Sequence, residues 1–390
     1  MAVMKMSQAA MMMFGSGSLA ILGDELKSRG LCRPIIITDK GVTGVGVTAK
    51  VEAVIKGAGL ECAIWDNCLS DAPTDSVDEA AAVVREFGAD AIIGLGGGSS
   101  MDTAKAVATV IKNPVPIKEV MARGRPMGPL PDPDLPLFTI PTTSGTGSEV
   151  SVVGVLSDSV TSRKSGVVIS GATLAIVDPE LTLGVPPHIT AWTGMDVIAH
   201  AIEAITGAMR NPMSDIRGFE ALRLAYAHLY NAVKDGSNIT AREGMSLASS
   251  LAALAFCDSV TTLAHATAQA LASVHHLHHG LLCGLGTPPE LELFAPVVPE
   301  RVRKIGEIFG ADIPYDATPE QIGKITADKI RVFMSSLGIQ SFEQMGLSRN
   351  DLTDHVDVLM DEGMKDFSPC PITREVALKM LSGMYDYAGA

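Results

Sequence analysis

Short apolar runs alternate with amphipathic stretches through the first half of the chain. The apolar runs, which have the length of buried strands, lie at residues 34–38, 61–65, 89–95, 135–141 and 174–178. The stretches with helical periodicity between the first of them lie at 47–59, 76–88 and 99–112. Strands that alternate with helices of about 10–15 residues predict βαβ units on a parallel sheet.

The pattern changes after about Pro187, where strand-like runs nearly vanish. Long alanine- and leucine-rich stretches with helical periodicity dominate there, for example at residues 217–236. We therefore predict an α/β N-terminal domain with a parallel sheet over residues 1–185 and an all-α C-terminal domain over 186–390, joined through 179–187.

Composition supports a large folded protein and excludes several classes. The 390 residues are too many for one simple core, and 47% apolar residues with 38 glycines argue against a disordered chain. A formal net charge of −14 disfavours nucleic acid as a partner, because binding phosphates requires a basic surface. The same charge fits a cytoplasmic enzyme. No apolar stretch reaches the roughly 18 residues of a membrane span, so we expect none.

The start of the chain and its cysteines exclude further classes. The first apolar run is broken by Ser7 and Gln8, and no small-residue cleavage motif follows it, so we expect no signal peptide. The six cysteines are scattered and form no CxxC pair, which argues against a zinc knuckle or a disulfide framework. None of them has an evident histidine partner for nucleophilic catalysis.

A glycine-rich segment, 94–105, follows one predicted strand and opens a predicted helix. The three glycines 96–98 would let backbone N–H groups approach a phosphate at the positive end of the helix dipole. Ser99 and Asp102 also fit the S-x-x-D capping box, so a well-capped turn without a ligand is the alternative interpretation. The GxGxxG dinucleotide fingerprint is absent, since Ser99 stands where the third glycine would be.

Two further features could contribute to the same ligand site. The segment 141–149 is a second loop of small residues after a strand, and could line the phosphate or the nicotinamide edge or be an ordinary turn. Asp39 follows the strand at 34–38, where a carboxylate can bind a ribose diol and repel a 2′-phosphate, favouring NAD over NADP. A lone aspartate there is more often a helix or turn cap.

Asp196 and His200 are four residues apart in a stretch with helical character, so both project from one face. They lie among apolar residues, where a buried carboxylate needs a partner. A simple Asp–His hydrogen bond is the alternative to a shared metal ion.

Five of the nine histidines lie between residues 265 and 280. His265 and His279 are fourteen residues apart, which puts their Cα atoms about 21 Å apart on an unbroken helix, too far for one ion. If both bind one metal, the first helix must end and the chain must fold back through 273–280, with Gly280 permitting a tight approach. The spacing alone does not predict a shared site.

The sequence resembles the iron-dependent (group III) alcohol dehydrogenase family over nearly its whole length. The motifs that carry the resemblance are FGSGSLAILGDEL at 14–26, ITDKG at 37–41, GGGSSMDTAK at 96–105, IPTTSGTGSE at 140–149, DPELT at 178–182 and GMDVIAHAIEA at 194–204. The resemblance implies a nucleotide domain of dehydroquinate synthase-like fold and a helical domain, with one divalent metal held between them. The ligands that it implies, all present here, are Asp196, His200, His265 and His279.

The same resemblance implies NAD as the cofactor and Fe²⁺ as the metal. Three imidazoles and one carboxylate also suit Zn²⁺ or Mn²⁺ better than Mg²⁺ or Ca²⁺. The residues that we expect at the dinucleotide are Asp39, Gly96, Gly97, Gly98, Ser99, Asp102, Thr142, Thr143, Thr146 and Lys164.

The chain departs from the family pattern where the substrate pocket is expected. Gln269 stands where many members carry a further histidine, and a glutamine can hydrogen-bond but cannot carry a proton near neutral pH. Ala72 interrupts what would be a PNPT motif. We expect a solvated turn at His275, His276 and His278, from which His275 could reach the substrate. Surface or capping roles are expected for His188, His228 and His355.

These features predict an NAD-dependent, metal-dependent alcohol dehydrogenase or aldehyde reductase for a small, polar substrate. The metal is expected to act as a Lewis acid on the substrate oxygen while hydride passes directly to or from the nicotinamide. The alternatives are a hydroxyacid–oxoacid transhydrogenase and a dehydroquinate synthase-like lyase; the lack of Lys and Arg at 265–280 disfavours the lyase. We expect a homodimer, because the strand-like segment 4–13 could pair across two chains.

Overall fold

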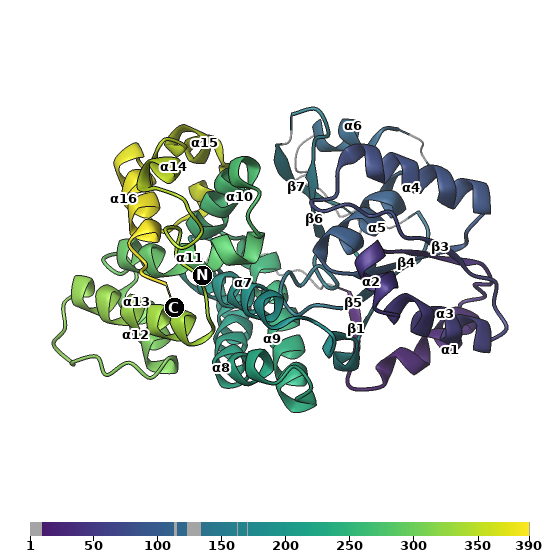
Figure 1. Cartoon of the computed structure of the whole chain (residues 1–390), viewed down its shortest axis with the longest axis horizontal. Helices are drawn as coiled ribbons and strands as arrows, with labels where there is room; N and C mark the ends of the chain where they lie inside the picture. Colours follow the sequence, from purple (N-terminus) through teal and green to yellow (C-terminus); the bar gives the residue numbers. More distant parts are fainter. Residues whose placement is uncertain (1–9, 113–114, 123–133, 162, 170, 390) are drawn as a thin grey trace. The chain divides into compact units, whose positions relative to one another are not determined.

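The chain forms two compact units that meet in sequence at Val185 and Pro186. The computed structural model drawn in Figure 1 describes residues 10–112, 115–122, 134–161, 163–169 and 171–389. The first unit contains the sheet and the second is built of helices, which confirms the predicted fold class.

The sheet of the first unit has six strands among the described residues, in the order β1-β8-β5-β4-β2-β3, and every pairing is parallel. Its strands are β1 (Met11–Phe14), β2 (Pro34–Ile37), β3 (Ala63–Trp65), β4 (Ala91–Gly96), β5 (Leu137–Pro141) and β8 (Leu174–Val177). Residues 4–9 of the predicted strand 4–13 lie outside the described residues, and β1 pairs with β8 of the same chain at one edge.

Both faces of this sheet are covered, which explains why its strands read as continuous apolar runs. Ile35 and Ile37 of β2 pack with Val77 in one core, while Ile36 packs with Val51 in another. The helices of this unit are α1 (Leu22–Ser28), α2 (Lys40–Gly44), α3 (Val47–Gly57), α4 (Thr74–Phe87), α5 (Gly98–Val110) and α6 (Ile117–Ala122), with 3₁₀ helices η1 (Ser18–Ile21) and η2 (Pro179–Thr182).

An antiparallel hairpin of β6 (Val153–Ser157) and β7 (Lys164–Val168) was not predicted. Glycines and serines interrupt the apolar residues of both strands, so neither has the uninterrupted run used to find the other strands.

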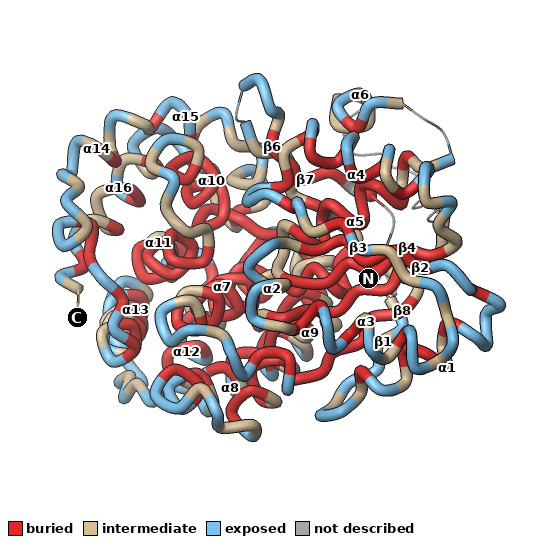
Figure 2. Tube along the Cα trace, turned by 45° about the vertical axis from the view of Figure 1, so that its right-hand side comes forward, coloured by how far each residue is buried: buried red, intermediate tan, exposed pale blue. Residues whose placement is uncertain are grey.

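The second unit contains no strand among its described residues. Its helices are α7 (Pro187–Thr206), α8 (Pro212–Lys234), α9 (Ile239–Ser259), α10 (Leu263–His275), α11 (His279–Phe294), α12 (Pro299–Ile308), α13 (Pro319–Ser336), α14 (Arg349–Thr353), α15 (Val356–Asp361) and α16 (Arg374–Tyr385), with the 3₁₀ helix η3 (Gly363–Phe367). Proline occupies the first position of α7, α8, α12 and α13, where its missing N–H costs no helical hydrogen bond. In Figure 2 the tube along α7, α10 and α11 is largely red, because these helices form the interior of the unit.

Within the described part of the chain, no single helix meets the length and apolarity required to cross a membrane. The helices α9 and α10 meet that requirement only as a pair, which is bent by 102°.

Candidate functional site

Helix α7 places Asp196, His200 and Glu203 on one side. The three residues follow one another at intervals of four and three, so their side chains project from the same face. Nearly all of the helix from Thr190 to Thr206 is buried. These polar groups are therefore positioned by a core helix rather than by a loop.

Two buried carboxylates from other helices hold the N-terminus of α10. Glu290 of α11 accepts hydrogen bonds from the Thr262 hydroxyl (2.8 Å) and from the first two N–H groups of the helix (both 3.0 Å). The third N–H, that of His265, donates to Glu203 Oε1 (3.0 Å). The first N–H groups of a helix have no partner within the helix, and here the two carboxylates accept them. This fixes the position of His265, which lies in the first turn of α10.

The chain reverses direction between α10 and α11, as a shared metal site would require. Helix α10 ends at His275, His276 is its C-cap in the left-handed conformation (φ 53°), and α11 begins at His279. Gly280 permits the close return, because a Cβ there would lie 2.5 Å from the carbonyl oxygen of Trp192 on α7.

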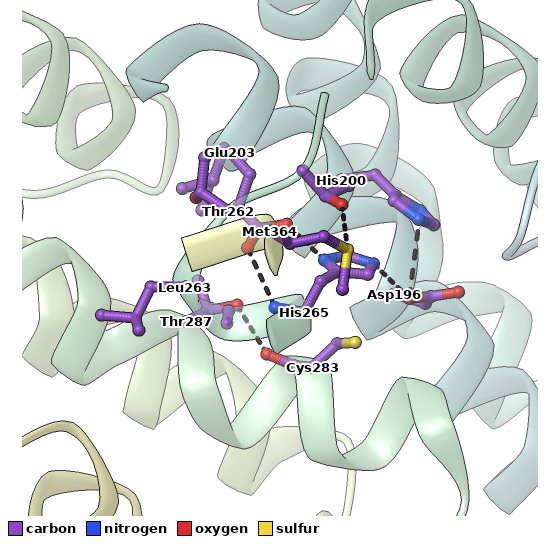
Figure 3. A network of polar contacts seen from close by, with 12 residues as sticks. Asp196, His200, Glu203, Thr262, Leu263, His265, Cys283, Thr287 and Met364 are labelled. Atoms are coloured by element: carbon purple, nitrogen blue, oxygen red, sulfur yellow. Dashed lines mark hydrogen bonds and ion pairs between the residues drawn. The ribbon is translucent and has the colours of Figure 1, made fainter. Parts of the chain in front are cut away.

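One oxygen, Asp196 Oδ1, faces the rings of three histidines, two of which are visible with it in Figure 3. It lies 3.5 Å from Nε2 of His265. It lies 3.9 Å both from Nδ1 of His200 and from Nε2 of His279. The structure thus brings together, from three helices, the four residues that the resemblance implies as metal ligands.

Two atoms of this cluster are buried without a hydrogen bond. Among the described residues, neither Asp196 Oδ1 nor His265 Nε2 has a hydrogen-bond partner, and these residues are only 2% and 3% exposed. A buried polar atom left in this state costs about 1–3 kcal/mol. Ligand atoms about 2.1 Å from one ion stand about 3.4 Å apart in a tetrahedral arrangement. The observed separations of 3.5 to 3.9 Å are slightly wider, so the donor set fits a divalent transition metal after small movements.

Glu203 determines which nitrogen of His265 faces the cluster. Its Oε2 is hydrogen-bonded to Nδ1 of His265, so the ring presents Nε2 to the cluster. Burial acts to raise the pKa of Glu203, but His265 outweighs burial and holds that pKa below its ordinary value. Burial likewise opposes ionisation of Asp196, and the three histidines outweigh it to lower the pKa of that carboxyl. Both groups are therefore carboxylates at neutral pH.

Cys283 belongs to the same cluster, although the sequence analysis assigned it no role. Its Sγ lies 3.5 Å from Nε2 of His279, and the ligand atoms of Cys283, Asp196, His265 and His279 all lie within 4.8 Å of one another. The expectation that no cysteine has a histidine partner is therefore wrong. Burial raises the pKa of the Cys283 thiol to about 12. The spacing of four residues between His279 and Cys283 was the signal that could have identified it.

The histidines of the turn between α10 and α11 are not part of the cluster. His275 Nε2 lies 2.8 Å from the backbone carbonyl oxygen of Asp351, His276 is exposed, and His278 is the N-cap residue of α11. Gln269 is buried on α10, one turn after His265. The remaining histidines lie elsewhere, at 188, 228 and 355.

In the first unit, two loops of small residues lie against each other at the carboxyl ends of β4 and β5. The Thr142 N–H donates to the Gly96 carbonyl (2.9 Å), and a Cβ on Gly98 would lie 2.9 Å from Thr146 Cγ2. The residues that meet around the N-terminus of α5 are Gly96, Gly97, Gly98, Ser99, Thr142, Thr143 and Thr146. The structure therefore joins the two predicted loops into one surface.

Asp39 lies at the same edge of the sheet, directly after β2. It caps α2 by accepting the Val42 N–H (3.0 Å), and it accepts the Ser100 hydroxyl (2.9 Å). A Cβ on Gly96 would lie 3.3 Å from Asp39 Oδ2, so the carboxylate borders the glycine loop. Asp39 therefore caps a helix and also lies where a carboxylate could bind a ribose.

The predicted capping box of Ser99 and Asp102 is wrong. Helix α5 begins earlier, with Gly97 as its N-cap residue and no side-chain cap. Because Ser99 falls inside the first turn, its hydroxyl accepts the N–H of Asp71 instead (3.0 Å). The Asp71 carboxylate in turn pairs with Lys164 Nζ at 2.7 Å, which ties β7 to the start of α5.

Asp102 points into the protein rather than toward the start of its helix. Its carboxylate accepts the Ser148 hydroxyl (2.5 Å) and the Val155 N–H (2.9 Å), and it pairs with the fully buried Lys105 (3.0 Å). It therefore anchors the β6–β7 hairpin and the second loop to α5.

The comparisons with known proteins cover both units. Residues 9–179 match the model of iron-containing alcohol dehydrogenases, and residues 190–385 match that of the C-terminal region of the Fe-containing alcohol dehydrogenase family. A choline dehydrogenase from Bacillus subtilis is 32% identical, with 90% of this chain and 87% of the relative covered. A sulfoacetaldehyde reductase from Bilophila wadsworthia is 33% identical, with 95% and 96% covered.

A solved structure extends the likeness to three dimensions. The sulfoacetaldehyde reductase from Bifidobacterium kashiwanohense, in complex with NAD⁺, matches with a TM-score of 0.84 at 29% identity. The match covers 99% of this chain and 98% of that structure.

Proposed function

Because the chain belongs to the iron-containing alcohol dehydrogenase family, we propose that it is an NAD(H)-dependent, divalent-metal-dependent alcohol dehydrogenase or aldehyde reductase. That the chain is an alcohol or aldehyde oxidoreductase follows from the family itself. The metal, the cofactor, the residues that bind them and the substrate are the content of the proposal.

The observation that carries the proposal is the convergence of three imidazoles on one buried carboxylate oxygen. Asp196, His200, His265 and His279 would hold the metal, and Fe²⁺ or Zn²⁺ suits this donor set. When bound, the metal supplies Lewis acidity toward an alcohol or carbonyl oxygen.

The chain's own groups prepare this site in two ways. Glu203 fixes the ring of His265 from the Nδ1 side, which keeps Nε2 directed at the cluster. The buried helices α7, α10 and α11 exclude water around Asp196 and His265, which strengthens electrostatic interactions there.

The dinucleotide would lie along the loops around the N-terminus of α5. NAD supplies or accepts the hydride when bound. The N–H groups at the start of α5, where no side chain caps the helix, suit its pyrophosphate, and Asp39 suits a ribose diol and repels a 2′-phosphate. The other residues that we assign to the cofactor are Gly96, Gly97, Gly98, Ser99, Thr142, Thr143, Thr146 and Lys164. Asp102, whose carboxylate points into the protein, would contribute only by anchoring the second loop.

We assign a small polar aldehyde or alcohol as the substrate. Gln269, buried one turn after His265, offers a hydrogen-bonding amide and no proton relay near neutral pH. The named relatives handle an anionic aldehyde and a cationic alcohol, so charge is the property that a substrate panel should vary. We extend the proposal to a homodimer in the cytoplasm, a location that suits the net charge of −14.

The test is NADH oxidation with neutral, anionic and cationic small aldehydes, before and after chelation and after adding back Fe²⁺ or Zn²⁺. We expect turnover that disappears on chelation and returns with one of these ions. Turnover that survives complete metal removal, verified by elemental analysis, would contradict the proposal. Absence of NADH turnover with every aldehyde would contradict it as well.

A further inference from the structure

Helix α11 carries a second group beside the candidate metal ligands. Cys283 follows His279 by four residues, which is one helical turn, so both side chains project from one face. Figure 3 shows its sulfur on the side of the network where Asp196 and His265 lie. Cys283 is completely buried, so its sulfur is enclosed with those groups.

The distances around the sulfur suit a shared ion. Cys283 Sγ lies 3.5 Å from Nε2 of His279. A sulfur about 2.3 Å and a nitrogen about 2.1 Å from one ion stand about 3.1 to 3.8 Å apart at the bond angles of about 90–120° that five ligands allow. The ligand atoms of Asp196, His265, His279 and Cys283 lie within 4.8 Å of one another, which one coordination sphere can span.

Two buried polar atoms beside Cys283 indicate that a ligand binds in this cluster. Asp196 Oδ1 and His265 Nε2 are each more than nine-tenths buried, and neither has a hydrogen-bond partner among the described residues. Both residues belong, with Cys283, to the group whose ligand atoms lie close together. The position of Cys283 is also fixed, because the Thr287 hydroxyl donates to its backbone carbonyl (3.0 Å).

We propose that Cys283 is a further protein ligand of the divalent ion assigned above to Asp196, His200, His265 and His279, and that it selects a thiophilic ion. This inference rests on the metal site of the proposed function. The thiolate coordinates, and the thiol proton leaves to solvent when the ion binds. A thiolate favours Zn²⁺ and Co²⁺ over Mn²⁺, so Cys283 biases the site toward the softer ions.

The test is the absorption spectrum of the full chain loaded with Co²⁺, because a cobalt–thiolate bond gives a near-ultraviolet charge-transfer band that imidazole and carboxylate ligands do not give. We expect this band in the wild type and in Cys370→Ala, which removes a cysteine of the same unit outside the cluster. Cys283→Ala and Cys283→Ser should lose it while retaining the weaker visible bands of bound cobalt.

A second readout uses competition with a chelator. Cys283→Ala should weaken Zn²⁺ binding by about 10- to 100-fold, the range for loss of a metal-site partner, and weaken Mn²⁺ binding much less. Wild-type protein with one bound Co²⁺ per chain and no charge-transfer band would overturn the role of Cys283 and leave the proposed function intact. Wild-type protein that retains no Co²⁺ would overturn both.

Discussion

The loops around the N-terminus of α5 and the Asp196 cluster of the helical unit differ in how far their polar atoms are hydrogen-bonded. Around the N-terminus of α5, Asp39 accepts the Ser100 hydroxyl, and Asp102 accepts the Ser148 hydroxyl and a backbone N–H. In the cluster of the helical unit, Asp196 Oδ1 and His265 Nε2 are buried and have no hydrogen-bond partner among the described residues. The carboxylates of the first region are satisfied within the protein, whereas the second region has buried atoms that a bound ion would satisfy.

This difference predicts different consequences of mutation in the two regions. Changes in the helical cluster should remove metal and activity while the rest of the fold remains. Changes in the loops should affect stability or cofactor preference while the metal remains bound. Four variants test that separation, in order of decreasing effect.

His265→Ala removes the proposed histidine ligand whose ring Glu203 fixes. Loss of the ion's Lewis acidity, worth several kcal/mol, should reduce kcat/KM by about 10³-fold or more. Steady-state kinetics and metal content by elemental analysis measure the effect. His276→Ala, at an exposed position of the same histidine-rich segment, should retain both activity and metal. Equal losses in the two variants would contradict the assignment of ligands within this segment.

Glu203→Gln keeps the shape of the side chain and removes its charge. The variant loses the carboxylate that accepts from Nδ1 of His265, so metal affinity should fall about 10- to 100-fold. Competition with a chelator measures that affinity. Glu300→Gln, in the first turn of α12, is the control and should bind metal like the wild type. Unchanged affinity in Glu203→Gln would show that the histidine is oriented without this contact.

Gly98→Ala tests the packing of the two loops. The added Cβ would lie 2.9 Å from Thr146 Cγ2, and such overpacking costs about 1–3 kcal/mol of stability. Denaturant unfolding should show that loss together with weaker NADH binding, and bound metal should be unchanged. Gly57→Ala, where a Cβ meets nothing within 4 Å, is the control. Loss of metal in Gly98→Ala would break the proposed separation of the two regions.

Asp39→Asn should have the smallest effect, on the choice between NADH and NADPH. Asparagine can still accept the Val42 N–H, so α2 keeps its cap, while the charge that repels a 2′-phosphate is lost. We expect the ratio of kcat/KM for NADPH to that for NADH to rise about tenfold, which corresponds to about 1.4 kcal/mol. Asp90→Asn, another aspartate that accepts backbone N–H groups, should leave the ratio unchanged.

Much of the fold could be predicted because its signals are local. The strands buried on both faces are uninterrupted apolar runs, and the change to helical periodicity near Pro187 coincides with the boundary at Val185. The β6–β7 hairpin was missed because its pairing is nonlocal and its strands contain glycine and serine.

The candidate site was only partly predictable, because it too depends on contacts between residues far apart in the sequence. Asp196 and His200 could be paired from their spacing, but bringing His265 near His279 requires a chain reversal that spacing cannot reveal. The spacing of Ser99 and Asp102 predicts a capping box, because the sequence does not show that the carboxylate of Asp102 is buried against the β6–β7 hairpin.

We propose that Asp196 Oδ1 and His265 Nε2, buried without a hydrogen-bond partner among the described residues, mark a metal site. The most direct measurement is anomalous X-ray diffraction from crystals of the Zn²⁺- or Fe²⁺-loaded protein, recorded at the absorption edge of that metal. We predict one strong peak per chain among Asp196 Oδ1 and the facing nitrogens of His200, His265 and His279. A fully loaded protein whose anomalous peak lies elsewhere, with these four side chains unliganded, would contradict the claim.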